Sequence, residues 1–162
     1  NVTEGSLKHV GMHAVNSLRM EKGYRHWGHD ISDEETPLEA GLGFSVAWDK
    51  PGGFIGKDTL LRQRDKGVQK RLVQFKLNDP GPLLYHNEPI FRNGAVTGYV
   101  TSGMYGHALG GAVGLGYVSN ADGVSDDFIA EGQFEIGVAG VKYRADASLR
   151  PLYDPKNKRI RS

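Results

Sequence analysis

The first part of the chain carries apolar residues at the spacing of an α-helix. They are Leu7, Val10, Ala14, Val15 and Leu18. Because residues at this spacing share one helix face, the pattern predicts a helix over residues 6–23. Thr3 or Ser6 is a suitable N-cap, Gly23 is a suitable end, and Lys22 in the last turn suits the negative end of the helix dipole.

The next forty residues alternate between turn signals and short periodic segments. Residues 24–37 are aromatic, acidic and turn-rich, and Pro37 argues against a long helix there. Residues 42–48 alternate apolar and polar positions and predict a strand. After a Pro-Gly-Gly break, residues 56–66 predict a short helix, with Asp58 near its start and Lys66 before Gly67.

From residue 68 onward the pattern changes to short alternating segments separated by turns. The predicted strands are 72–77, 88–92, 95–102, 112–118, 133–138 and 141–147. Asn93-Gly94 is a strong hairpin signal and Ala139-Gly140 predicts a second turn. Five or six short strands favour a small barrel or sandwich. We therefore predict an α+β, mostly β chain with a boundary near residues 66–70.

Composition narrows the functional classes. The 23 glycines are spread without a period, which fits a chain rich in turns and bulges. A formal net charge of +1 gives no broad basic surface, so we expect no nucleic-acid partner. With no cysteine there is no disulfide framework or thiolate metal site. No apolar run approaches the length of a membrane helix. Since the chain begins at Asn1, we expect it to be a piece of a longer protein or a processed chain.

Several candidate sites have weak patterns. His9 and His13 lie four apart on the predicted helix, but without a carboxylate set we expect no metal site. Ser102 follows a strand and lacks the surroundings of a nucleophile elbow. The acidic run over residues 30–35 is typical of a solvated surface. No phosphate-binding glycine loop is present, so we expect no flavin or nicotinamide domain in this segment.

Arg19 is the residue with the clearest chemical signal, since it stands between two apolar residues. Such an arginine usually pairs with a carboxylate, either inside the protein or on a ligand. Glu21 and Glu39 are the candidates for an internal partner. Tyr24 and Trp27 follow closely and suit either stacking on a flat ring or core packing.

Long ordered motifs then resemble one family. "SLRMEKGYRHWGHDISDEETPLEAGL" and "KPGGFIGKDTLLRQRDKG" resemble motifs of the aminomethyltransferase (T-protein) superfamily, and "KRLVQFKL", "GAVTGYVTSGMYG" and "AVGLGYV" continue the match. The similarity runs over residues 11–153. It implies that residues 1–67 are the C-terminal part of a second, folate-binding lobe of helices and strands. Residues 68–162 would then be the small antiparallel C-terminal β-barrel domain of an aminomethyltransferase.

Two segments, "RMEKGYRHWGHDI" and "PLYDPKNKRIR", resemble the dimethylglycine and sarcosine dehydrogenase branch of this family. Members of that branch oxidise an N-methylglycine on FAD in an N-terminal domain. Their C-terminal folate region captures the one-carbon unit on tetrahydrofolate as 5,10-methylenetetrahydrofolate. The resemblance implies that this chain is the C-terminal fragment of such an enzyme, inactive alone, with the rest of the parent polypeptide and folate as its partners.

The resemblance carries over only a few site residues. Arg19 matches an arginine that contacts folate, Tyr153 lies where relatives place an aromatic residue beside it, and Glu21 matches a structural glutamate. No residue matches the catalytic aspartate, so we expect no catalytic residue here. The location would be cytoplasmic in a bacterium and the mitochondrial matrix in an animal. Two alternatives stay open: a flavin-free aminomethyltransferase or folate-dependent demethylase, and a non-catalytic folate- or partner-binding module.

Overall fold

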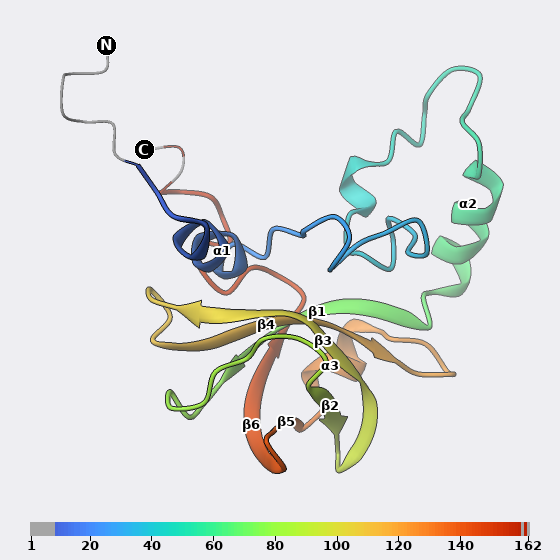
Figure 1. The fold of residues 1–162 in the computed structure, drawn as a ribbon. Helices are drawn as coiled ribbons and strands as arrows, with labels where there is room; N and C mark the ends of the chain where they lie inside the picture. Colours follow the sequence, from blue (N-terminus) through green and yellow to red (C-terminus); the bar gives the residue numbers. More distant parts are fainter. Residues whose placement is uncertain (1–8, 160, 162) are drawn as a thin grey trace.

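A closed antiparallel barrel forms the centre of the molecule (Figure 1). The structure is a computed structural model and describes residues 9–159 and 161. Around the barrel the strands follow the order β1-β4-β3-β2-β5-β6. Their bounds are β1 Lys70–Leu77, β2 Pro89–Arg92, β3 Ala95–Gly106, β4 Gly111–Ser119, β5 Phe134–Val138 and β6 Val141–Ser148. The prediction of a mostly β chain with a small antiparallel barrel is confirmed.

Two tight turns set the registers of the hairpins β2–β3 and β5–β6. Asn93 and Gly94 have φ of 52° and 85°, and Ala139 and Gly140 have φ of 48° and 82°. Two successive positive φ angles give the turn whose twist matches that of antiparallel strands. Both turns were predicted from the sequence, and Phe91–Val96 and Val138–Val141 are among the pairs that they bring opposite each other.

The barrel interior is filled by side chains from every strand. The buried residues of this core are Val73, Phe75, Leu77, Leu84, Ile90, Val100, Ala112, Val118, Val124, Ile129, Phe134, Ile136 and Ala145. Small residues let the strands approach closely. A Cβ on Gly116 of β4 would lie 2.6 Å from the carbonyl oxygen of Tyr99 on the neighbouring strand, so only glycine fits there.

A second, smaller core covers the outer face of β1 and β4. Met20 from the N-terminal helix packs with Leu72, Val113, Leu115 and Tyr117. As a result β4 is covered on both faces, and eight of its nine residues are buried. This outer core fixes the N-terminal helix on the barrel, and the functional site lies at that junction.

The helix α1, Met12–Glu21, is shorter than predicted and presents a different face to the barrel. Thr3 and Ser6 lie outside the described residues, and the N-cap is Gly11, without a side-chain hydrogen bond. Its buried residues are Ser17, Met20 and Glu21. By contrast, Val10, Val15 and Leu18 from the apolar stripe are exposed by 57%, 46% and 60%. An apolar stripe normally packs against a core. The face of the helix that carries this stripe is therefore uncovered.

Beyond the helix, residues 42–67 extend away from the barrel as an arm (Figure 1). The strand predicted over residues 42–48 is wrong: a 3₁₀ turn η1, Gly43–Ser45, replaces it. No described strand pairs with the segment, and the N–H groups of Ser45, Val46 and Trp48 bond to carbonyls two or three residues back instead. The predicted helix is present as α2, Lys57–Lys66, with Asp58 in its first turn.

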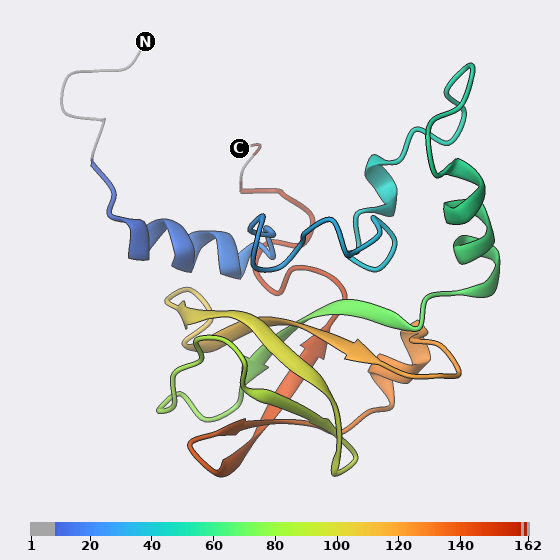
Figure 2. The ribbon, with the colours of Figure 1, turned by 45° about the vertical axis from the view of Figure 1, so that its right-hand side comes forward.

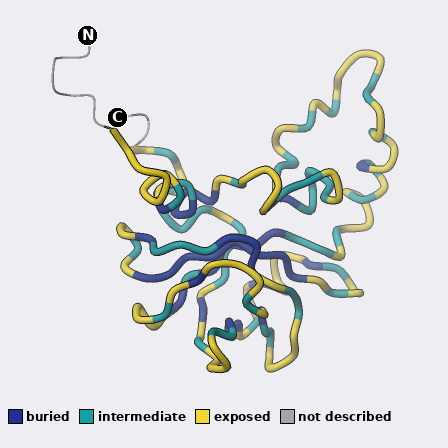
Figure 3. Tube along the Cα trace, viewed as in Figure 1, coloured by how far each residue is buried: buried dark blue, intermediate teal, exposed yellow. Residues whose placement is uncertain are grey.

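Most of the arm is exposed, as Figure 3 shows, and Leu60 is its one buried residue. Phe44 is 85% exposed and Ile55 is fully exposed. A further short helix, α3, Asp126–Ala130, was not predicted; Ser125 caps it by accepting from Phe128 N. Among the described residues, no helix is long and apolar enough to cross a membrane. The division of the chain at residue 67 stays a prediction.

Candidate functional site

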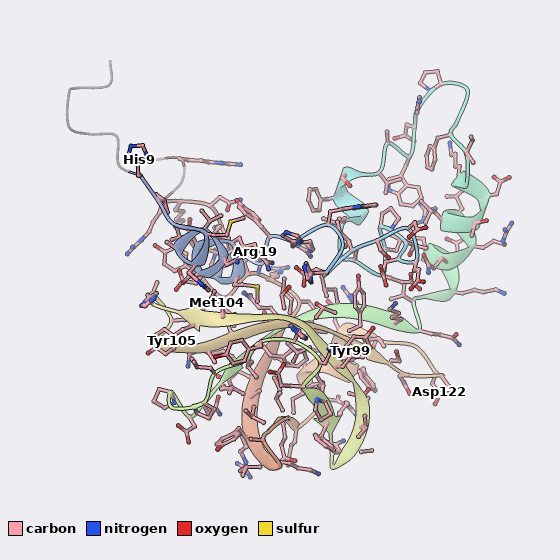
Figure 4. The ribbon with its side chains drawn as sticks, in the orientation of Figure 1. His9, Arg19, Tyr99, Met104, Tyr105 and Asp122 are labelled. Carbon is pink, nitrogen blue, oxygen red and sulfur yellow. The ribbon has the colours of Figure 1, made fainter. Side chains whose placement is uncertain are left out.

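Arg19 lies in the last turn of α1, between the helix and the barrel (Figure 4). Its Nε donates to Asn16 Oδ1 at 3.1 Å, and NH1 donates to Asp30 Oδ2 at 2.8 Å and to the carbonyl oxygen of Tyr24 at 3.1 Å. NH2 donates to Ser102 Oγ at 3.1 Å. The guanidinium is therefore held from four sides while its side chain stays 16% exposed. These bonds engage four of the five N–H donors of the guanidinium, so one N–H of NH2 is left for an anionic or polar ligand group.

Asp30 is the acidic partner of Arg19, and its side chain is fully buried. The carboxylate also accepts from His26 N at 2.8 Å and from Thr101 Oγ1 at 2.6 Å. The Tyr117 hydroxyl donates to the Asp30 carbonyl oxygen at 2.9 Å. Burial raises the pKa of Tyr117 far above its usual value, with nearby carboxylates adding to the effect, so it remains a donor. These bonds join the 26–30 turn to the barrel.

The internal partners predicted for Arg19 are wrong. Glu21 is buried but accepts from Ala108 N at 2.6 Å, and Glu39 accepts from Thr36 N at 2.9 Å. The solvated reading of the acidic run also fails at Asp30, because the tight 26–30 turn points its carboxylate inward. An aspartate two residues after Gly28, whose φ is 88°, is the signal that identifies this turn.

A hollow of about 210 Å³ opens beside the guanidinium. Its lining consists of Asn16, Arg19, His26, His29, Tyr85, His86, Thr101, Ser102 and Gly103. The rings of His26 and His29 meet edge to face with centroids 4.8 Å apart. The described residues that line the hollow include an arginine and three imidazoles but no carboxylate. Its wall therefore favours carboxylates and other hydrogen-bond acceptors.

The two aromatic residues that follow α1, Tyr24 and Trp27, do not belong to the core. Tyr24 is 53% exposed and Trp27 is 68% exposed. A parallel bridge from Trp27 to Ile31 closes the turn between them. Tyr85 and His86, on the loop before β2, reach the hollow although the sequence carried no pattern that singled them out.

Tyr153 lies on the C-terminal tail, which rises past the end of α1 (Figure 2). Its N–H donates to the carbonyl oxygen of Glu21 at 3.3 Å, and its hydroxyl accepts from Arg159 NH1 at 3.1 Å. The residue is half-buried and does not line the hollow beside Arg19. The structure thus brings the Tyr153 backbone to the helix that carries Arg19.

The weaker candidates lie elsewhere or have other partners. His9 precedes α1, so it forms no helical pair with His13. Ser102 Oγ accepts from Arg19, whose guanidinium stays protonated and cannot serve as a base. Within residues 9–159 and 161, no three His, Cys, Asp or Glu side chains gather as metal ligands do.

Two family models match this chain, one over the barrel and one over the segment before it. Residues 70–154 match the model of the glycine cleavage T-protein C-terminal barrel domain. Residues 2–50 match that of the GCVT N-terminal domain. The first match spans β1 to β6 and the start of the tail, and the second includes Arg19 and Asp30.

Relatives include two amine-oxidising enzymes. The chain is 46% identical over 155 residues to a 4-methylaminobutanoate oxidase (formaldehyde-forming) of Paenarthrobacter nicotinovorans, covering 96% of this chain and 18% of the relative. It is 40% identical over 157 residues to the mitochondrial sarcosine dehydrogenase of Homo sapiens, covering 96% of this chain and 17% of the relative. The chain thus spans less than a fifth of the length of these relatives.

A solved structure supports the same grouping. The glycine cleavage system aminomethyltransferase T from Bartonella henselae superposes with a TM-score of 0.78 at 27% identity. The superposition covers 94% of this chain and 41% of that protein. A closed barrel, the domain match across it and the shared architecture agree. The chain belongs to the glycine cleavage T-protein family and carries its C-terminal barrel domain.

Proposed function

We propose that this chain is the C-terminal part of an FAD- and tetrahydrofolate-dependent dehydrogenase of N-methylglycines, where it forms one wall of the folate site. The observation that supports this most is the Arg19 guanidinium, held by four hydrogen bonds at a hollow without carboxylates. The sarcosine dehydrogenase and 4-methylaminobutanoate oxidase relatives support the amine-oxidising reading.

The residues of the hollow suit tetrahydrofolate, which carries carboxylates and amide oxygens as acceptors. When bound, tetrahydrofolate supplies the nitrogen nucleophile that captures the one-carbon unit. Arg19 would hold the ligand by one charge-assisted hydrogen bond, and Asp30 would fix the direction of the guanidinium. The contribution of this chain is orientation, which accelerates a reaction between two bound groups by proximity. The acid–base residue and the FAD domain would belong to the remainder of the parent.

We also propose the parent polypeptide as the chain's main partner. The apolar stripe of α1 ends at Leu18, which is 60% exposed, and Phe44 and Ile55 on the arm are more exposed still. Exposed apolar surface of this extent usually marks an interface. Preceding parts of the same parent would cover these residues. The parent would be mitochondrial in an animal and cytoplasmic in a bacterium.

A second candidate is a flavin-free aminomethyltransferase or folate-dependent demethylase. The superposition on an aminomethyltransferase favours it, because the shared fold covers 94% of this chain. The two candidates differ in whether the intact protein oxidises an N-methylated amine.

The test uses the full-length parent supplied with sarcosine, an electron acceptor and tetrahydrofolate. Amine oxidation is measured together with the ratio of 5,10-methylenetetrahydrofolate to free formaldehyde. In Arg19→Ala this ratio should fall, while the control Arg71→Ala, near the start of β1 and paired with Asp126, should keep the wild-type ratio. An unchanged ratio in Arg19→Ala would remove Arg19 from the folate site. Absence of amine oxidation in the wild type would favour the flavin-free candidate.

A further inference from the structure

We propose that Lys22 is a positioning residue that locks the C-terminal tail onto α1 and so places Tyr153 relative to Arg19. This inference rests on the proposed folate site and adds a second, distant segment to it. In the sequence, Lys22 is explained by the helix dipole alone, because a cation suits the last turn of a helix. The contact with the tail is a separate role.

The Lys22 ammonium lies among oxygens of the tail. Nζ donates to the carbonyl oxygen of Asp154 at 2.8 Å and to Asn157 Oδ1 at 2.7 Å, and Asp154 Oδ2 lies 3.6 Å away. The Lys22 and Asp154 side chains are 9% and 8% exposed. An ammonium has three N–H donors that it can turn toward separate acceptors, so three converging oxygens suit lysine.

The tail is shaped so that these oxygens converge. Asp154 and Asn157 have φ of 45° and 53°, and Asn157 N donates to the Asp154 carbonyl oxygen at 2.9 Å. The Asp154 carboxylate accepts from Lys158 N at 2.8 Å and Arg159 N at 3.2 Å. Burial acts to raise the pKa of Asp154, but these N–H bonds and the charge of Lys22 outweigh it and lower the pKa. The loop is thus wound around a carboxylate that stays ionised.

The lock continues a row of contacts that aligns the tail with the helix end. Gln74 of β1 donates from Nε2 to the carbonyl oxygen of Met20 and accepts from Leu152 N at 2.8 Å. One residue further along both segments, Tyr153 N donates to the Glu21 carbonyl oxygen. The Lys22–Asp154 contact is the next in this row. Arg19 immediately precedes Met20, the first helix residue in this row. The alignment of the tail with the helix therefore sets the position of Tyr153 relative to Arg19.

The contact joins residues 132 positions apart in the sequence. They belong to the two segments, "RMEKGYRHWGHDI" and "PLYDPKNKRIR", on which the resemblance to the dehydrogenase branch rests. In the structure these segments form one assembly at the end of α1. A role in setting the position of Tyr153 relative to Arg19 would account for both segments with one contact.

The test compares Lys22→Met, Lys22→Arg and the control Lys142→Met in the full-length protein. Methionine keeps the apolar stem but removes the charge, and arginine keeps the charge but presents a planar fork to oxygens that converge on one point. Lys142 lies on β6, where its Nζ covers the Phe91 ring 3.8 Å from the centroid. Binding of 5-formyltetrahydrofolate is measured by calorimetry, and melting temperature is measured in parallel.

Lys22→Met should weaken binding by about three- to tenfold, the size of one displaced hydrogen-bonded contact. Lys22→Arg should fall between this variant and the wild type, and Lys142→Met should match the wild type. In a Tyr153→Ala background, Lys22→Met should weaken binding no further, because the residue it positions is gone. If Lys22→Met fails to fold, Asn157→Ala takes its place with the same expectation.

Three results would overturn the proposal. They are a lower melting temperature with unchanged folate affinity in Lys22→Met, wild-type affinity in Tyr153→Ala, and equal losses from Lys22→Met with and without Tyr153. If the proposed folate site itself is wrong, the pattern differs, because Arg19→Ala would then bind folate with wild-type affinity. Loss of binding in Arg19→Ala with normal binding in Lys22→Met rejects the lock alone.

Discussion

Replacing Asp30 by asparagine tests the network that fixes Arg19. The substitution keeps the shape of the side chain but removes the negative charge from a fully buried site. Arg19 loses its ionic partner at 2.8 Å, although an amide oxygen in the place of Oδ2 still accepts from Arg19 and His26 N. The amide NH2 then faces Thr101 Oγ1, whose proton can turn to the carbonyl oxygen of Leu115. The Arg19 charge is thus left partly buried without a counter-charge.

Removing one partner of a buried ion pair costs about 3–5 kcal/mol. Since the Arg19 side chain keeps 16% exposure and the asparagine oxygen still accepts, we expect the lower end, about 3 kcal/mol. With a urea dependence of about 2 kcal/mol per molar, this moves the unfolding midpoint down by about 1.5 M. The pair is worth less than this to the wild type, because the loss includes the cost of an unpaired charge.

Urea unfolding followed by circular dichroism and tryptophan fluorescence measures the loss. Asp126→Asn is the matched control, since Asp126 pairs with Arg71 at the same 2.8 Å but is 83% exposed. Its expected effect is below about 0.5 kcal/mol. The double variant Arg19→Met/Asp30→Asn should lose less stability than the two single variants lose in sum, by at least about 1 kcal/mol.

A loss in Asp30→Asn no larger than that of Asp126→Asn would show that Asp30 does not hold the Arg19 guanidinium in place. Strict additivity of the two single variants would do so as well, because it would mean that Arg19 and Asp30 do not stabilise each other. Either result would leave the direction of the guanidinium without a physical cause.

Two further predictions concern the contact between Glu35 and β1 and the uncovered helix face. Burial acts to raise the pKa of Glu35, but hydrogen bonds from Lys70 and Ser32 outweigh it and lower the pKa from its ordinary value of 4.5. The bond to Lys70 therefore stabilises the fold fully above pH 4.5. This stabilisation is lost as the pH falls through the lowered pKa of the folded state. Glu35→Gln should therefore cost about 1 kcal/mol at pH 7 and almost nothing near pH 3, and a pH-independent loss in urea unfolding would contradict this. Leu18→Lys should change the stability of this chain alone by less than about 0.5 kcal/mol, because Leu18 is exposed and a cation suits the last turn of a helix. In the full-length protein thermal unfolding should show a loss of about 2 kcal/mol, and equal small losses in both would contradict the covering of α1 by the parent.

The barrel was accessible to sequence reasoning because its signals are local. Alternation over residues 72–77 and 141–147 and the Asn93-Gly94 turn each indicate their own conformation. Registers follow once such turns are placed, since a one-residue slip would turn every buried side chain outward. The strands alone left a barrel and a sandwich open, and the resemblance to the aminomethyltransferase family indicated the barrel.

The errors arose where structure depends on distant residues. Residues 42–48 alternate as a strand does, but a strand also requires a neighbour to pair with. The helical spacing of Val15 and Leu18 identifies a face without saying what covers it. At the site, Glu21 was nearer to Arg19 in sequence, yet the turn at Gly28 brings Asp30 to the guanidinium. The contact of Lys22 with the tail had no local signal at all.

The most direct test of the account is the affinity of the full-length protein for 5-formyltetrahydrofolate, measured by calorimetry with Arg19→Ala, Arg19→Lys and the control Arg71→Ala. A hydrogen bond to a charged group contributes about 1.5–3 kcal/mol, so Arg19→Ala should bind about 10- to 150-fold more weakly. Arg19→Lys should also bind more weakly, because it keeps a charge for Asp30 but loses the fork, while Arg71→Ala should match the wild type. Wild-type affinity in both folded Arg19 variants would contradict the claim that this hollow belongs to a folate site.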